Sequence, residues 1–499
     1  MKKRGDLALT MRLENRILEQ CARCNGEKSF WWRGTWWSRR VLSDLAGKCE
    51  EVLREAGFQE GSRLAVLLPN SPVFLALMIA VWKLGGTLIP LNLQAGKAAI
   101  AANLMHAEAC GVMLPQGMEQ IAEELSKSGI PAATTPLEGP PPAFSARSVS
   151  RSDPETAVLF YTSGTTGTPK AVPVSHANLI DNVDRSVEHF TDLQEGDTFL
   201  NVLPNFHALG FTTSGLLPLV GGFSQVILPT FMPAETTLEA IRTAEVSVVI
   251  AVPTMITLLL GAIARGAAAP ATLRILISGG DRFPERLDDR ARKLFGVGVL
   301  EGYGLTETSP VVSVNPNYAS KKLGTAGTIL DGYEVEVRDG GGNVLTPCRE
   351  GTLWLRGPSV FKGYFRDPEK TAERIKDGWF NTGDVVRLDE DGYLFILDRE
   401  TDIIIVGGFN VYPTEVEAVL QEIPEVRESA VVGVPHHVSG EIVKAYVVTN
   451  PETQIQVREI LSFCRNRLAH YKVPRRVEFV EELPRSSIGK VLKRELRRR

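Results

Sequence analysis

The sequence contains only six cysteines in 499 residues, which is too few for a fold held together by disulfide bonds. Cys21 and Cys24 form one CxxC pair, but no second pair follows to complete a zinc site. The pair lies in the helix-like stretch LENRILEQCARC, where two buried or half-exposed thiols are the simpler interpretation. Sparse cysteines of this kind favour reduced thiols and a cytoplasmic location.

The sequence also lacks a charge excess and a long apolar run. It has 55 Lys and Arg residues against 59 Asp and Glu, a formal net charge of −4, which argues against a dedicated nucleic-acid-binding protein. The most apolar segment, residues 72–92, is interrupted by Lys83 and Gly85-Gly86, and about ten apolar residues in a row are too few for a transmembrane helix. The basic start has no apolar core behind it, so no secretory signal is expected. Loose membrane association through an apolar substrate stays open.

Strand-like and helix-like patterns alternate through the first 320 residues. SFWWRGTWWSRR is typical of a strand, a turn, a second strand and the start of an amphipathic helix, and SRLAVLLPN of a buried strand before a buried helix. Later β-type runs, such as VSVVIAVP, LRILISGG and GVGVLEGYG, end in Gly or Pro. This alternation predicts an α/β fold with parallel-type sheets flanked by helices. Ligands in such folds gather at the carboxyl ends of the strands.

The pattern changes twice toward the C-terminus. From about residue 323, short strands and Gly-rich turns predict a small β-barrel or meander. After FILDRETD a fresh α+β pattern begins and ends in the basic tail GKVLKRELRRR. We therefore expect a large N-terminal domain over residues 1–398, a hinge over 399–402 and a smaller, mobile α+β domain over 403–499.

The segment YTSGTTGTPK, residues 161–170, is the first candidate binding loop. Its glycines permit unusual backbone angles, so successive N–H groups can form a concave nest for an anion. Hydroxyl donors and one lysine charge complete a cradle suited to a polyphosphate, although composition alone leaves a flexible surface loop as the alternative. The spacing is not that of a Walker A loop. The candidate phosphate-binding residues are Thr162, Ser163, Gly164, Thr165, Thr166, Gly167 and Lys170.

Four further segments follow this loop: EGYGLTETSP (301–310), GWFNTGDVVRLDEDGYLFILDR (378–399), GGFNVYPTEVE (407–417) and PRSSIGKVLKREL (484–496). In this order, the five segments resemble the signatures of the adenylate-forming superfamily, which includes acyl-CoA synthetases, aryl-CoA ligases, luciferases and peptide-synthetase adenylation domains. The resemblance covers nearly the whole chain. It implies an enzyme that uses ATP and Mg²⁺ to convert a carboxylic acid to an acyl-AMP and then transfers the acyl group to a thiol.

The resemblance assigns roles in the nucleotide site. It implies that Glu307 binds Mg²⁺, which favours one or two carboxylates beside phosphate oxygens, and that Thr306 contacts the α-phosphate. Tyr303 offers a flat face to adenine, with simple core packing as the alternative. Asp384 and Arg399 hold the ribose hydroxyls, and a structural salt bridge is the alternative for this pair. The remaining residues expected around the base are Gly279, Gly280, Asp281, Gly302 and Gly304.

The C-terminal domain is expected to alternate between two poses. In the first, the resemblance makes Lys490 the lysine that bridges the α-phosphate and the substrate carboxylate, whereas composition alone makes it a solvated tail residue. In the second, the CoA-channel segment Gly407, Gly408 and Phe409 replaces it, and the thiol attacks the acyl-AMP. The hinge departs from the family pattern, because Thr401 stands where Asp or Lys is usual.

The substrate is the least determined feature. His207, in LPNFHALGF, resembles the histidine beside the family's acyl site, and we expect it to form a pocket wall and gate; a satisfied core histidine is the alternative. No charged residue stands out around it, which favours a medium- or long-chain fatty acid with CoA as the acceptor. An acyl carrier protein as acceptor and an aryl acid as substrate remain alternatives. A rival from another class is a non-catalytic nucleotide or acyl-AMP sensor, but loss of Glu307 or Lys490 would mark such a protein, and both are present.

Overall fold

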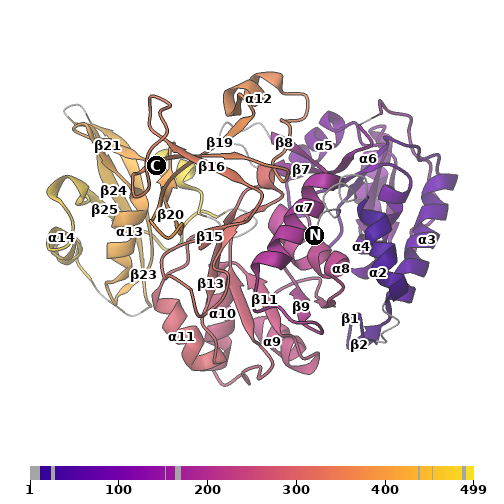
Figure 1. Ribbon diagram of the computed structural model, residues 1–499, viewed down its shortest axis with the longest axis horizontal. Coiled ribbons are helices and arrows are strands. Elements are labelled where there is room, and N and C mark those ends of the chain that lie inside the picture. The colour runs from indigo at the N-terminus through magenta and orange to yellow at the C-terminus, as the bar shows by residue number, and fades with distance from the viewer. Residues whose placement is uncertain are drawn as a thin grey trace. The chain divides into compact units, whose positions relative to one another are not determined.

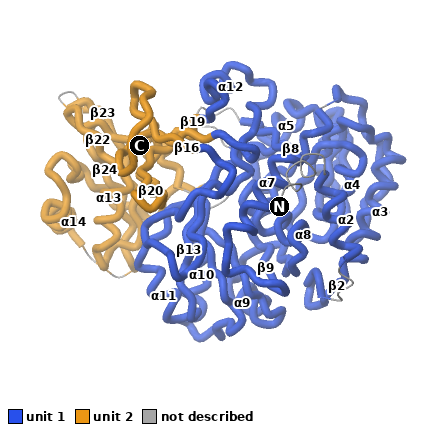
Figure 2. The backbone as a smooth tube through the Cα atoms, in the orientation of Figure 1, with its two compact units in different colours: residues 1–334, 356–380 blue, residues 335–355, 381–499 orange. Residues whose placement is uncertain are grey.

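The structure is a computed structural model that describes residues 12–23, 28–151, 153–162, 170–436, 439–451, 453, 455–485 and 491–499 (Figure 1). The chain forms two compact units. The first comprises residues 1–334 and 356–380, and the second comprises residues 335–355 and 381–499 (Figure 2). Among the described residues, no helix is both long enough and apolar enough to cross a membrane.

The first unit contains a six-stranded sheet with the order β6-β5-β3-β4-β7-β8. Its strands are parallel except for β7 and β8, which pair antiparallel at one edge. The strands are β3 (Arg63–Val66), β4 (Thr87–Pro90), β5 (Gly111–Pro115), β6 (Ala132–Thr135), β7 (Thr156–Thr162) and β8 (Lys170–Ser175). Helices α2 (Leu13–Arg23), α3 (Arg39–Glu55), α4 (Pro72–Lys83), α5 (Lys97–His106), α6 (Glu119–Lys127) and α7 (His176–His189) accompany it.

A nine-stranded sheet completes the core of this unit, with the order β15-β14-β13-β12-β11-β9-β10-β1-β2. Its centre is parallel, and β2, β14 and β15 add antiparallel edges. The strands are β1 (Phe30–Trp32), β2 (Thr35–Trp37), β9 (Thr198–Asn201), β10 (Ser224–Ile227), β11 (Val248–Ala251), β12 (Ile275–Ser278), β13 (Leu300–Gly304), β14 (Val311–Val314) and β15 (Thr328–Ile329). The helices along this stretch are the π-helix η1 (Gly210–Leu216), α8 (Leu217–Gly221), α9 (Ala234–Thr243), α10 (Pro253–Ala264) and α11 (Arg286–Phe295).

Helix α4 shows why the two sheets form one core. Every residue from Pro72 to Trp82 is buried, and the helix has no polar stripe to turn toward water. Its start is fixed by Ser71, whose hydroxyl accepts a hydrogen bond from the backbone N–H of Phe74. One cluster of buried side chains joins α4 and α7 to strands of both sheets. The apolar run 72–92 is therefore a buried helix followed by β4, which confirms the sequence interpretation.

The second unit contains strands of a five-stranded sheet and a separate α+β layer. The order of the first sheet is β16-β17-β19-β18, with β20 paired to β19; its strands are β16 (Glu334–Arg338), β17 (Gly351–Arg356), β18 (Ile375–Lys376), β19 (Trp379–Leu388) and β20 (Leu394–Arg399). Helix α12 (Pro368–Arg374) and β18 belong to the first unit, where β18 pairs with Trp379 and Phe380. The β-rich region expected from about residue 323 is therefore this sheet. Most residues of the sheet belong to the same compact unit as the C-terminal residues.

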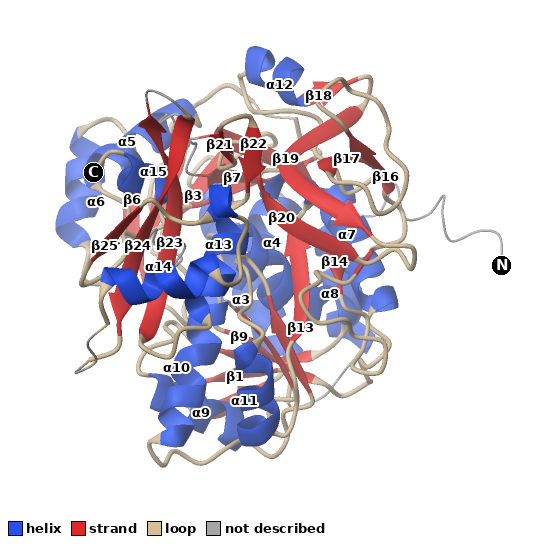
Figure 3. Cartoon of the chain, turned by 90° about the vertical axis from the view of Figure 1, so that its left-hand side faces the viewer, coloured by secondary structure: helices blue, strands red, loops and turns tan. Residues whose placement is uncertain are grey.

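The α+β layer has the strand order β22-β21-β24-β23, with β25 paired to β24 (Figure 3). Apolar side chains of α13 and α14 cover one face, and Leu496 of α15 packs on the other with Tyr446. The elements are β21 (Ile404–Val406), β22 (Phe409–Val411), α13 (Pro413–Gln421), β23 (Val426–His436), β24 (Gly440–Thr449), α14 (Val457–Arg465), η3 (His470–Lys472), β25 (Arg476–Phe479) and α15 (Lys493–Arg497). The large α/β region and smaller C-terminal region confirm the expected fold class, and the hinge at 399–402 stays a prediction.

Candidate active site

The carboxyl ends of β12 and β13 bring two predicted segments together. These strands are parallel neighbours, with Ser278 opposite Glu301, so the glycines after β12 lie beside Gly302 and Tyr303. Gly280 has a φ of +83°, which favours glycine. At Gly304 an added Cβ atom would lie 2.0 Å from the carbonyl oxygen of Pro310, so a side chain there would collide with backbone.

A cavity of about 90 Å³ opens beside these strand ends. Among the described residues that line it, none is Asp, Glu, Lys or Arg. The predicted residues that line it are His207, Gly279, Gly280, Gly302, Tyr303, Gly304 and Thr306. Most of the other lining side chains are apolar and come from α7, β9, β11, β12, β14 and the residues after His207.

His207 lies in the wall of this cavity, and its expected role beside an acyl group stays a prediction. Its ring Nδ1 accepts a hydrogen bond from the backbone N–H of Leu209 over 3.3 Å, which orients the ring just before the π-helix η1. Asp281 differs, because it is exposed, its carboxylate accepts from the neighbouring N–H of Arg282, and it is not among the lining residues. The structure therefore does not bring Asp281 to the cavity with the adjacent glycines.

A polar cluster forms around Glu307, the residue after cavity-lining Thr306. The hydroxyl of Tyr364 donates to the Glu307 carboxylate over 2.9 Å, and the Lys170 ammonium lies 5.4 Å from the centre of the Tyr364 ring. Burial and the neighbouring carboxylate raise the pKa of Tyr364 above its usual value, so this hydroxyl remains a donor. Lys170 is held opposite Thr162 in the β7–β8 ladder. The residues between them, including Ser163, Gly164, Thr165, Thr166 and Gly167, lie outside the described residues.

The contacts of Glu307 in this cluster are compatible with its predicted role as a magnesium ligand. A carboxylate that accepts one hydrogen bond keeps further lone pairs, so Glu307 can still bind a hard cation. The turn that carries it is fixed by Asn182 of α7, whose side-chain amide donates to the carbonyls of Thr308 and Val311 over 3.2 and 2.8 Å. Sequence analysis missed Tyr364 and Asn182. Each contacts a residue more than 50 positions away in the sequence, and a local sequence pattern does not predict such contacts.

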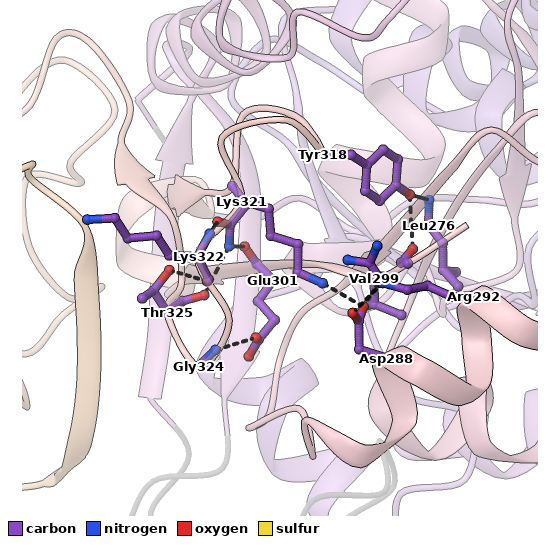
Figure 4. A network of polar contacts seen from close by, with 12 residues as sticks. Leu276, Asp288, Arg292, Val299, Glu301, Tyr318, Lys321, Lys322, Gly324 and Thr325 are labelled. Carbon is purple, nitrogen blue, oxygen red and sulfur yellow. Dashed lines mark hydrogen bonds and ion pairs between the residues drawn. The ribbon is translucent and has the colours of Figure 1, made fainter. Parts of the chain in front are cut away.

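A buried polar network joins α11 to Val299, the residue just before β13, and to Lys321 (Figure 4). Asp288 of α11 accepts from the Lys321 ammonium over 2.5 Å, from the Arg292 guanidinium over 2.9 Å and from the backbone N–H of Val299 over 2.6 Å. The side chains of Asp288 and Lys321 are each 2% exposed. Nearby, burial raises the pKa of Glu301, two residues before Tyr303 on β13, to about 7.

Replacement of Lys321 with methionine is expected to lower the free energy of unfolding by about 3 kcal/mol, because it leaves a buried carboxylate without its buried partner. Arg292→Met is the matched control, because Arg292 contacts the same carboxylate but is 54% exposed, and its loss should cost less than about 1 kcal/mol. Urea unfolding of both variants, followed by tryptophan fluorescence, checks the difference. Equal losses would contradict the role given to burial.

The predicted ribose pair is adjacent in the second unit. Asp384 of β19 lies directly opposite Arg399 of β20, and the Arg399 Nε donates to the Asp384 carboxylate over 3.0 Å. The Asp384 side chain is buried, whereas that of Arg399 is 44% exposed. The structure brings these two residues together, and their role toward ribose stays a prediction.

The segment predicted to line the CoA channel forms the tight turn between β21 and β22. Gly407 and Gly408 have φ angles of +59° and +86°, as a two-residue hairpin of this kind requires. Phe409 is 58% exposed and stacks on Tyr471 with ring centres 4.7 Å apart. At the predicted hinge, Thr401 is exposed in a turn. Lys490 lies outside the described residues.

Comparison with known families identifies the class of protein to which this fold and site belong. The family model described as AMP-binding enzyme matches residues 18–365, and that of the AMP-binding enzyme C-terminal domain matches residues 415–490. The first match alone spans more than half of the chain, so the protein belongs to the AMP-binding enzyme family. This confirms the resemblance found in the sequence.

Two relatives show the range of substrates among similar proteins. A feruloyl-CoA synthase from Amycolatopsis sp. is 35% identical over 469 residues, which cover 93% of this chain and 94% of the relative. A long-chain-fatty-acid–CoA ligase from Yersinia pestis is 40% identical over 347 residues, which cover 69% of this chain and 61% of that protein.

Two solved structures share the fold. ATP-bound MatB from Rhodopseudomonas palustris has a TM-score of 0.88 at 32% identity, over 98% of this chain and 99% of MatB. The O-succinylbenzoate CoA synthetase of Bacillus subtilis, solved with ATP and a magnesium ion, has a TM-score of 0.85 at 27% identity, over 97% and 99%.

Proposed function

We propose that this protein is an AMP-forming acid–CoA ligase that uses ATP and Mg²⁺. In the first step, a carboxylate oxygen of the acid attacks the α-phosphorus of ATP, and pyrophosphate leaves. In the second step, the thiol of CoA attacks the acyl carbon of the acyl-AMP, and AMP leaves. The family match and the CoA ligases among the relatives support this assignment. The same relatives favour CoA over a carrier protein as the acceptor.

The observation that carries the proposal is the position of the cavity. Thr306 lines the cavity, and the next residue, Glu307, belongs to the cluster with Tyr364 and Lys170. A carboxylate at the Thr306 end of the cavity would therefore lie beside phosphates held by the β7–β8 loop. Preorganised donors and a cation placed where charge develops account for much of the rate in such reactions.

Different residues of this chain bind different parts of ATP and of the acid. Lys170 and the loop before it bind the β- and γ-phosphates, and Glu307 would hold Mg²⁺, which neutralises phosphate charge when bound. Tyr303 contacts adenine, Asp384 and Arg399 bind the ribose, and His207 forms the wall beside the acyl group. Lys490 completes the site for the first step, and the Gly407–Phe409 turn replaces it for the second.

The cavity narrows the choice of acid. An uncharged lining disfavours a second carboxylate, because a buried charge without a partner is costly. The apolar lining suits the medium- and long-chain fatty acids expected from the sequence. An aryl acid is the second candidate, and the full-length match to a feruloyl-CoA synthase favours it.

Product analysis tests the proposal. The protein is incubated with MgATP, CoA and single acids: C6 to C16 fatty acids, cinnamic acids and a dicarboxylic acid. We expect an acyl-CoA and AMP from at least one monocarboxylic acid and none from the dicarboxylic acid. Acyl transfer to a phosphopantetheinylated carrier protein but not to CoA would overturn the choice of acceptor.

A further inference from the structure

Four buried side-chain amides form one hydrogen-bonded network beside the segment that carries His207. They belong to Asn70, Asn201, Asn205 and Gln225, and each side chain is at most 3% exposed. Asn201, at the end of β9, lies at the centre. Its Oδ1 accepts from the Nδ2 of Asn70 over 3.1 Å and from that of Asn205 over 3.0 Å. Its own Nδ2 donates to the Oε1 of Gln225 on β10 over 2.8 Å.

The network ends on the π-helix η1, at both of its ends. Asn205 donates from Nδ2 to the carbonyl oxygen of Gly210 over 3.1 Å, and Gln225 donates from Nε2 to that of Gly215 over 3.3 Å. Gly210 is the first residue of η1 and Gly215 the last but one. A π-helical turn is rare and is frequently found at functional sites. Two side-chain amides therefore fix the backbone of such a turn in place.

The segment is also packed closely against the network. A Cβ atom added at Gly210 would lie 2.4 Å from the carbonyl oxygen of Pro204, and one added at Gly215 would lie 3.3 Å from the Nδ2 of Asn205. The backbone N–H of Asn205 in turn donates to the Oδ1 of Asn70 over 2.9 Å. Movement of η1 toward the network is thus blocked, and movement away from it breaks hydrogen bonds that are buried.

The position of η1 determines part of the cavity wall. Leu209, Thr213 and Leu217, from this helix and the residues that flank it, line the cavity. The hydroxyl of Thr213 donates to the carbonyl of Leu209 over 2.7 Å, so these two wall residues are joined to each other. None of the four network residues is among the described residues that line the cavity. Any effect of the network on the acid must therefore pass through the position of η1.

We infer that Asn205 and Gln225 are positioning residues that hold η1 in place and thereby set how strictly the cavity discriminates between acids of different size. This role rests on the proposed function and concerns how the same site selects its acid. An acid too large for a packed apolar wall binds only if the wall deforms, and the resistance to deformation is the source of the selectivity. Here that resistance includes the two amide bonds to η1. The two residues have no part in the bond changes.

Asn205→Leu and Gln225→Met test this role, because they remove the amide donors at nearly constant side-chain volume. The kcat/KM of pyrophosphate release is measured for the best fatty or cinnamic acid and for the same acid lengthened by two carbons, as a 4-ethyl group on a cinnamic acid. We expect the wild type to prefer the shorter acid by about tenfold or more. Each variant should reduce this ratio by about fivefold, the typical value of one hydrogen bond.

The ratio separates positioning from a merely structural role. Loss of stability lowers the amount of active enzyme and scales both values of kcat/KM equally, so the ratio stays the same. The two variants act on opposite ends of η1, so Gln225→Met tests the role even if Asn205→Leu does not fold. The double variant should accept the two acids almost equally.

Asn315→Leu is the matched control. Asn315 is 0% exposed, and its Nδ2 donates to the carbonyls of Glu301 and Thr325 over 3.2 and 3.0 Å. It is not among the described residues that line the cavity. This variant also loses a buried amide, and its thermal unfolding midpoint should fall. Its ratio between the two acids should remain that of the wild type.

The outcomes distinguish this role from the proposed function. Unchanged ratios in the folded variants would overturn the role of the network and leave the ligase intact. An equal fall in Asn315→Leu would also overturn it, because the effect would then not depend on η1. The same holds for a wild type that does not discriminate between the two acids. No release with any acid overturns the proposed function, and this role with it.

Discussion

Replacement of Glu307 with glutamine is expected to slow acyl-AMP formation by about a hundredfold or more. Glutamine keeps the size of the side chain and an oxygen that can accept from the Tyr364 hydroxyl, so the local fold should persist. The substitution removes the negative charge that a hard divalent cation requires of a protein ligand. The Mg²⁺ concentration needed for half-maximal rate should therefore rise together with the loss in rate.

Tyr364→Phe is the matched control for Glu307→Gln. It removes the hydroxyl that donates to Glu307 but keeps the ring near the Lys170 ammonium. We expect a loss of about tenfold, typical of one hydrogen bond to a charged group. Single-turnover formation of acyl-AMP over a range of Mg²⁺ concentrations measures both variants. A Glu307→Gln enzyme with wild-type rate and wild-type Mg²⁺ dependence would contradict the role given to this carboxylate.

Replacement of Lys490 with alanine is expected to affect the two half-reactions unequally. Acyl-AMP formation should fall by about 10²–10³-fold, because the variant lacks the positive charge that offsets the attack of a carboxylate on the α-phosphate. Thioester formation from supplied acyl-AMP should stay close to the wild-type rate, because the two-pose mechanism moves this lysine away before the thiol attacks. Rapid-quench assays of each half-reaction measure the two rates separately.

A reciprocal variant checks the two-pose account. In the turn between β21 and β22, Gly408 has a φ of +86°, so Gly408→Ala strains this turn while leaving Lys490 in place. It should slow thioester formation more than acyl-AMP formation. Equal loss of both half-reactions in Lys490→Ala, or in Gly408→Ala, would contradict alternation between two poses.

Much of the fold could be predicted because its signals are local. The Arg33-Gly34 turn between β1 and β2 is marked by its residue types and has φ angles of +48° and +87°. A continuous run of apolar residues predicts helix α4, and the alternation of strand-like and helix-like patterns predicts the parallel strands of both sheets. The grouping of β16, β17 and β20 with the C-terminal residues could not be read from the sequence, because it depends on contacts between distant segments.

The candidate site divides in the same way. The residues after β12 and on the end of β13 were singled out by their resemblance to family segments, and the structure brings them to one edge because the two strands are parallel neighbours. Tyr364 and Asn182 were not found, because each is brought to the site by tertiary packing and has unremarkable sequence neighbours. Asp281 does not line the cavity although two adjacent glycines do, and its expected role beside the base stays a prediction.

The most direct test of the central claim is carboxylate-dependent release of pyrophosphate from MgATP, measured with fatty and aryl acids and with CoA present or absent. The account predicts release that requires an acid, is strongest with one class of acid and is accelerated by CoA, which draws off the acyl-AMP. ATP bound without pyrophosphate release, for any acid in the panel, would contradict the account and indicate a protein that senses nucleotides without catalysing this reaction.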